Sequence, residues 1–190
     1  PPVESFVIEA YPTNQSINYE LGEGVNLISY VGIDGMAVSE AIPDEYENSF
    51  YGVIGQGTAT VQLSEDNWVG SLTEFNHLKG YWVQVDEELN FNWNITNTLA
   101  RESKSINSKT IDVLNEFSFS QSTQQAFYFI EDINLEGDLI SNNDWVLAYN
   151  NNIIIGARKW MGEFTDVPAM GLDNFENTIG YIESGNIPEF

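Results

Sequence analysis

Short runs of alternating apolar and polar residues recur along the chain. The clearest is LNFNWNI at residues 89–95, in which four apolar residues alternate with three asparagines. Successive side chains of a β-strand point to opposite faces, so this pattern predicts a strand with one face in a core and the other in water.

The first half of the chain contains several such strand patterns and one helix pattern. The strands are predicted at residues 5–12, 21–31, 51–63, 67–72, 80–85 and 89–95. They are rich in β-branched and aromatic residues and are bounded by Gly, Pro and Asn. One short helix is predicted within residues 36–46, and Pro43 limits its length because proline cannot continue a helix.

The second half predicts strands throughout. Four patterns fall at residues 117–121, 125–133, 144–150 and 152–160, and two or three shorter ones follow within 165–190. The asparagines at 150–152 lie between two apolar runs, where a tight hairpin turn is expected. So many short strands separated by turns favour an antiparallel sandwich.

Charge divides the chain into two parts. Residues 1–98 hold 15 acidic residues and one base, whereas residues 99–190 hold 14 acidic residues and five bases. Three of these bases, Arg101, Lys104 and Lys109, lie in a polar stretch without clear periodicity. This pattern predicts an N-terminal β-rich domain at 1–98, a linker at 99–111 and a C-terminal β-sandwich at 112–190. The alternative is a long loop within one domain.

The predicted fold class is therefore mainly β, with two small antiparallel, sandwich-like β domains of which the first has one short helix. Both halves contain the same short sequence pattern, a polar turn followed by Trp-Val. SEDNWVGSL (64–72) and SNNDWVLAY (141–149) each lead from a polar turn through Trp-Val into a strand. We expect Asn67 and Asp144 to form the turns and the tryptophans to anchor the strand heads. Convergent packing explains this better than a duplication, because nothing else in the halves aligns.

The composition of the chain restricts the classes of partner that it can bind. Six Lys/Arg against 29 Asp/Glu give a net charge of -23 over 190 residues, which argues against nucleic acid and anionic membrane surfaces. The chain has no cysteine and no apolar run long enough to insert into a membrane. Its ends, Pro1-Pro2 and a strand pattern closing at Phe190, are those expected of a piece of a longer polypeptide.

Catalysis is not predicted. His77 is the only histidine, and no nucleophile elbow, phosphate loop or paired-histidine motif is present. Two carboxylates could cleave a glycoside, but 29 acidic residues give close pairs by chance. The sequence therefore predicts a protein that is not an enzyme.

Two kinds of small ligand remain open. Oxygen ligands for Ca²⁺ gather in one turn-rich segment, at Glu131, Asp132, Asn134, Glu136, Asp138 and Asp144. The alternative there is a solvated acidic loop, and residues 173–178 form a weaker candidate of the same type. Glycans are the second kind, since they stack on exposed aromatic side chains. Trp160, which follows two bases and precedes a loop, is the tryptophan expected to be exposed for this role.

Two resemblances come from short motifs. LGEGVNLISY (21–30) followed by LKGYWVQV (78–85) resembles a domain of secreted and cell-surface bacterial proteins, which pairs a Gly-Trp-Asn-Leu-Ile-Ser strand with a late Gly-Tyr-Trp strand. Val25 stands where that pattern has Trp. NNDWVLAYNNNIIIGARKW (142–160) with GYIESGNIPEF (180–190) resembles small β-sandwich repeats of secreted marine bacterial and phage structural proteins. The resemblances cover residues 21–93 and 125–190, and neither implies catalytic residues.

These observations predict a non-catalytic structural or adhesion module located extracellularly, on a cell surface or on a virion surface. Its expected partners are other protein subunits or copies of itself, joined through strand edges. Residues 5–12 and 186–190 are the apolar, strand-like segments that would supply such contacts. The simpler outcome is that both pair within their own domains. The competing function is a carbohydrate-binding module of a larger secreted protein.

Overall fold

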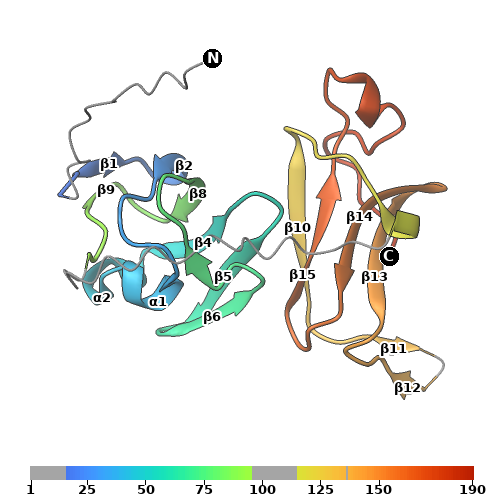
Figure 1. The fold of residues 1–190 in the computed structure, drawn as a ribbon, viewed down its shortest axis with the longest axis horizontal. Helices are drawn as coiled ribbons and strands as arrows, with labels where there is room; N and C mark the ends of the chain where they lie inside the picture. Colours follow the sequence, from blue (N-terminus) through green and yellow to red (C-terminus); the bar gives the residue numbers. More distant parts are fainter. Residues whose placement is uncertain (1–15, 96–114, 136) are drawn as a thin grey trace, which may run out of the picture.

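The computed structural model describes residues 16–95, 115–135 and 137–190. The fold is mainly β with antiparallel sheets, which confirms the predicted fold class. The two halves lie beside each other, with the N-terminal strands in blue to green and the C-terminal strands in yellow to red (Figure 1). The predicted strand at 5–12 and the predicted linker at 99–111 lie outside the described residues.

The N-terminal half is built on a five-stranded sheet of order β2-β8-β4-β5-β6. Two short pairs, β1-β9 and β3-β7, accompany it. The strands are β1 (Tyr19–Leu21), β2 (Gly24–Ser29), β3 (Met36–Ala37), β4 (Phe50–Ile54), β5 (Ala59–Ser64), β6 (Asn67–Gly70), β7 (Glu74–Phe75), β8 (Gly80–Val85) and β9 (Leu89–Phe91). All sheet pairings are antiparallel.

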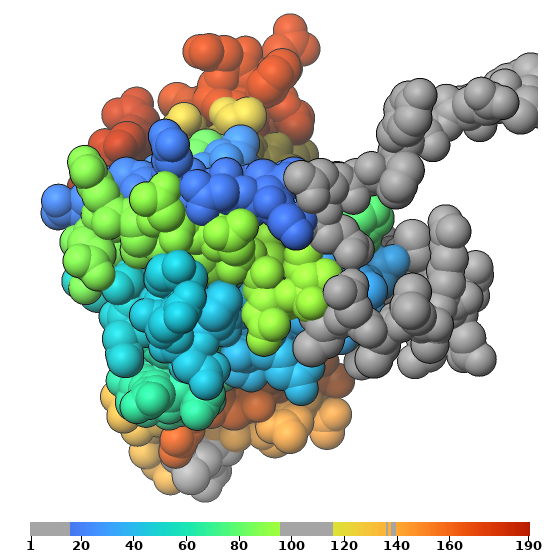
Figure 2. Space-filling view, turned by 90° about the vertical axis from the view of Figure 1, so that its left-hand side faces the viewer, coloured from blue at the N-terminus to red at the C-terminus, as the bar shows by residue number. Residues whose placement is uncertain are grey.

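The helical segment is divided into two single turns, α1 (Val38–Ala41) and α2 (Asp44–Glu47). Ile42 separates them with extended dihedral angles, φ -90° and ψ 119°. A residue before proline is disfavoured in the helical region, so Pro43 interrupts the predicted helix and then caps the second turn. These turns and the β1-β9 pair lie on the face of the N-terminal half seen in Figure 2.

One face of the five-stranded sheet packs into an aromatic core. Along β8 the side chains of Tyr81, Val83 and Val85 are buried while those between them are exposed, as the alternation predicts. Phe75 and Trp93 meet at the centre of this core, with ring centroids 4.8 Å apart. The other face of β8, which carries Trp82, is left open to solvent.

The LNFNWNI strand is shorter than predicted. It pairs with β1 only as far as Phe91, although Trp93 is still buried beyond its end. The side-chain amide of Asn92 donates to the carbonyl of Ile17, and that of Asn94 donates to the carbonyl of Glu40. These bonds hold the segment against the core without a sheet partner, so the pattern predicted the burial but not the strand's end.

The C-terminal half contains two antiparallel ribbons, β10-β15 and β13-β14, and the small hairpin β11-β12. Its elements are η1 (Asn115–Phe117), β10 (Gln125–Ile130), β11 (Asn134–Leu135), β12 (Asp138–Leu139), β13 (Trp145–Asn150), β14 (Ile153–Lys159), β15 (Thr165–Met170) and η2 (Glu176–Thr178). The strand predicted at 117–121 is wrong, because that segment begins in a 3₁₀ turn and then continues without strand pairing.

The two ribbons pack tightly where β14 crosses β15. A side chain at Gly156 would collide with the carbonyl of Pro168, so only glycine permits this approach. The neighbouring Ile155, Val167 and Ala169 are buried in the core between the ribbons. At the end of the β13-β14 hairpin, Asn151 has a φ of 54°, which confirms the predicted asparagine turn.

The two Trp-Val openings differ in detail. Asp144 accepts hydrogen bonds from the backbone and hydroxyl of Ser141 and so forms the predicted turn. In the first half the turn residue is Asp66, with a φ of 59°, rather than Asn67. The indole of Trp68 donates to buried Glu47 at 2.6 Å, which anchors β6 to α2.

A buried ion pair joins the halves. Arg158 and Asp166 lie on β14 and β15, with 2.9 Å between Nη2 and Oδ2, and both are almost fully buried. Asp166 accepts hydrogen bonds from the backbone N–H groups of Ala59 and Ser71, while Arg158 donates to the carbonyl of Gly57. Each half also has its own hydrophobic cluster. Independent folding of the halves stays a prediction.

Candidate functional site

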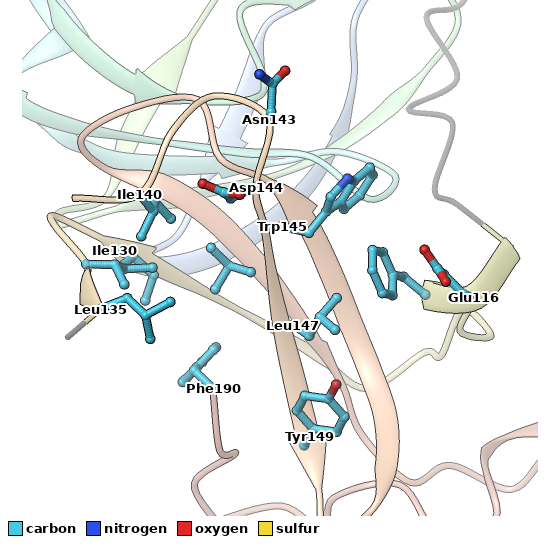
Figure 3. A pocket seen from close by; sticks show the side chains of 13 residues that line it. Glu116, Ile130, Leu135, Ile140, Asn143, Asp144, Trp145, Leu147, Tyr149 and Phe190 are labelled. Atoms are coloured by element: carbon cyan, nitrogen blue, oxygen red, sulfur yellow. The ribbon is translucent and has the colours of Figure 1, made fainter. Parts of the chain in front are cut away.

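A groove of about 1000 Å³ lies in the C-terminal half, beside β13 (Figure 3). Trp145, Leu147 and Tyr149 extend into it from β13. The opposite wall comes from the end of β10, the β11-β12 region and the C-terminal Phe190. Most of these side chains are apolar and half-buried or exposed, so the groove offers an extended apolar surface rather than a polar reaction site.

The groove runs along a strand edge that is mostly unpaired. β13 pairs with β14 on one side. On the other side, Tyr149 exchanges two backbone hydrogen bonds with Glu189, at 2.8 and 3.0 Å. Backbone groups of alternate residues in an antiparallel strand point to the same edge, so those of Leu147 point to the edge at which Tyr149 meets Glu189. No other backbone partner on this edge occurs among the described residues.

The predicted calcium ligands are distributed along the same region. Glu131 and Asp132 are exposed after β10, and Asn134 lies in β11, where its side-chain oxygen accepts a hydrogen bond from the backbone of Gly137. Glu136 lies outside the described residues. Asp138 belongs to β12, and its side chain lies outside the description.

The last predicted ligand, Asp144, has a structural use. The backbone and hydroxyl of Ser141 donate to one of its oxygens, and these bonds lower the pKa of the Asp144 carboxyl. Within the part of the chain that the structure describes, no three acidic or histidine side chains gather as a metal site would require. Calcium binding therefore stays a prediction. The groove is also lined by the apolar residues Ile133, Leu135 and Ile140. Nothing in the sequence pattern marks these three residues as part of a binding site.

Trp160 is not the exposed tryptophan. Its side chain is 8% exposed and belongs to the hydrophobic cluster of the C-terminal half. Its backbone N–H donates to the carbonyl of Asp144, which draws the end of β14 against the start of β13. The predicted exposure is therefore wrong, because the residue completes a hairpin instead of entering the loop that follows.

Trp82 is the tryptophan with an exposed face. It lies on the outer face of β8, is 44% exposed and lines a second cleft of about 380 Å³ between the two halves. Phe175, 63% exposed, lies on the C-terminal side of this cleft. The polar lining consists of Gln56, Gln121, Ser122, Thr123, Gln125 and Asp173. Sequence periodicity places Trp82 on an alternating strand but cannot show which face remains uncovered.

Asp173 organises the C-terminal wall of this second cleft. Its carboxylate accepts hydrogen bonds from the backbone N–H of Thr123, the hydroxyl of Thr178 and the backbone N–H of Phe175. The hydroxyl of Ser122 donates to it as well. These bonds lower the pKa of the Asp173 carboxyl strongly, the bond from Thr123 contributing most. Both oxygens are thus engaged in holding the loop that was the weaker calcium candidate.

The only histidine of the chain, His77, makes a hydrogen bond through its backbone. The backbone N–H of His77, in the loop before β8, donates to Asp34 at 2.6 Å. No helix among the described residues is long and apolar enough to cross a membrane.

In comparisons with family models, with curated proteins and with solved structures, nothing matches this chain.

Proposed function

We propose that the chain is a non-catalytic structural or adhesion module of an extracellular, cell or virion surface, which assembles with other copies by accepting an added strand along β13. The observation that carries the proposal is the open edge of β13 beside an apolar groove. An added strand would pair with backbone groups such as those of Leu147 and place alternate side chains against the groove walls.

The donor that we propose is residues 5–12 of a neighbouring copy. This segment, SFVIEAYP, contains four consecutive residues from Ser5 to Ile8 without charge, three of them apolar, and a single acidic residue, Glu9. The other candidate, at the C-terminus, is already engaged, since Glu189 pairs with Tyr149 in its own chain. Backbone pairing does not depend on opposite charges, so it suits a chain of net charge -23.

Sedimentation of the full chain tests this assembly. We expect concentration-dependent oligomers that strengthen with salt, because screening weakens the repulsion between acidic copies. Deleting residues 1–12 should yield a monomer with both halves still folded by near-ultraviolet circular dichroism. A charge in the groove, Leu147→Lys, should do the same. Leu172→Lys, on an exposed surface outside the groove, is the matched control and should leave assembly unchanged.

Three outcomes would contradict this assembly. A wild-type chain that stays monomeric at high concentration and salt would overturn the proposal. So would oligomers that persist after residues 1–12 are removed. Loss of the N-terminal fold in the deletion would show instead that this segment pairs within its own chain.

A further inference from the structure

The cleft between the halves has aromatic groups on opposite sides. Trp82 comes from the central region of the N-terminal sheet, and Phe175 comes from the loop before η2. Ile54 lies across from Trp82 in the pairing of β4 with β8 and extends the apolar surface. Gly55 and Gly80 also line the cleft, so a ligand can approach the backbone closely there.

Side-chain amides supply the polar part of the cleft. Gln56 and Gln121 are exposed and form no side-chain hydrogen bond with the described residues. Gln125 contributes a carbonyl oxygen that is buried yet has no hydrogen-bond partner in the described structure. An amide offers both donors and an acceptor, which matches the hydrogen bonding of a hydroxyl group.

Charge further restricts the ligand. Asp173 is the only carboxylate among the described residues of the lining, and both its oxygens are occupied by Ser122, Thr123, Phe175 and Thr178. The described lining also contains no Lys or Arg that could receive an anion. With a net charge of -23 around it, the site disfavours acidic ligands. A neutral ligand with an apolar face and hydroxyl edges remains, which is the chemistry of an uncharged sugar ring.

We infer that this cleft binds a neutral oligosaccharide. A sugar ring lies with its C–H face on the indole of Trp82, and its hydroxyl groups exchange hydrogen bonds with Gln56, Gln121 and Gln125. Phe175, held by its backbone bond to Asp173, closes the second side. The volume of about 380 Å³ falls within the range of small-ligand sites. Because the walls come from different halves, the bound sugar also strengthens their contact.

Isothermal titration and NMR of the full chain with five neutral tetrasaccharides test the inference: those of glucose in β-1,4 and α-1,4 linkage, and those of mannose, xylose and N-acetylglucosamine in β-1,4 linkage. We expect at least one to bind with a dissociation constant below about 1 mM, as a shallow aromatic site allows. Trp82→Ala should weaken this binding at least tenfold, because central aromatic residues dominate binding energy. Gln121→Ala should weaken it severalfold.

The matched control is Tyr51→Ala. Tyr51 is 55% exposed on the adjacent strand β4 but does not line the cleft, so the affinity should stay within twofold of the wild type. Binding by none of the five sugars would overturn the inference, as would equal affinity of the wild type and Trp82→Ala. Sedimentation of Trp82→Ala separates this result from the strand assembly, which uses no residue of the cleft and should be retained.

Discussion

At the scale of single residues, Asp173 shows how one side chain can fix a loop. Its two oxygens join the segment before β10 to the segment before η2 through Thr123 and Phe175. Hydrogen bonds to the ionised form lower its pKa below the unfolded value. Because the Asp173 carboxyl has a lower pKa in the folded state than in the unfolded state, its ionised form stabilises the fold at pH values above the unfolded-state pKa. This stability is lost as the pH falls toward the folded-state pKa.

Thermal unfolding as a function of pH checks this effect. The unfolded pKa of an aspartate is about 3.9, so the melting temperature of the wild type should fall below about pH 4. Asp173→Asn should have a lower melting temperature at pH 7 and a flatter profile below pH 4. The control is Glu176→Gln, an exposed carboxylate at the start of η2, which should keep the wild-type slope. Parallel profiles for wild type and Asp173→Asn would contradict the assignment.

At the scale of elements, the crossing of β14 over β15 depends on a missing side chain. Gly156→Ala places a methyl group against the carbonyl of Pro168, and both strands must shift to receive it. Overpacking of this kind costs about 1–3 kcal/mol. Urea denaturation should therefore show a loss of unfolding free energy in that range. Gly22→Ala, where an added methyl group meets nothing, should change the free energy by no more than about 0.5 kcal/mol.

The sequence predicts those elements in which apolar and polar residues alternate over enough positions to define a strand. β8 has the predicted bounds, and the asparagine turn between β13 and β14 is where the pattern places it. Two-residue pairs such as β3 with β7 leave no period and were not predicted. The exposed face of β8 and the buried Trp160 depend on which distant segments pack nearby, which local pattern does not contain. The cleft around Trp82 was missed for the same reason, because its lining joins β4, β8 and segments of the other half.

At the scale of the whole molecule, a buried ion pair of the C-terminal half, Arg158 with Asp166, also bonds to the N-terminal half. Burial raises the pKa of the Asp166 carboxyl and lowers that of Arg158, while the charge of each partner opposes these shifts. Replacing both by apolar residues would leave the backbone N–H groups of Ala59 and Ser71 without their acceptor. The pair is therefore more than a local contact, since it also satisfies donors of the neighbouring half.

Asp166→Ala should be strongly destabilising. Removing one partner of a buried pair typically costs about 3–5 kcal/mol, because the other charge stays buried without compensation. Calorimetry should show a lower melting temperature and two separated transitions once the halves lose their contact. Glu163→Ala, an exposed carboxylate shortly before β15, should leave a single transition near the wild-type temperature. One unshifted transition in Asp166→Ala would show that the pair does not hold the halves together.

Among the described residues, the N-terminal half presents four groups to this pair, and three of them belong to the main chain: the carbonyl of Gly57 and the N–H groups of Ala59 and Ser71. Only the hydroxyl of Ser71 is a side-chain contribution. During evolution, most side chains of the first half could therefore change without removing the contact, provided that its loops kept their backbone course. Arg158 and Asp166 have no such freedom. Recombination could join the same C-terminal half to diverse partner domains that offer two similarly shaped loops.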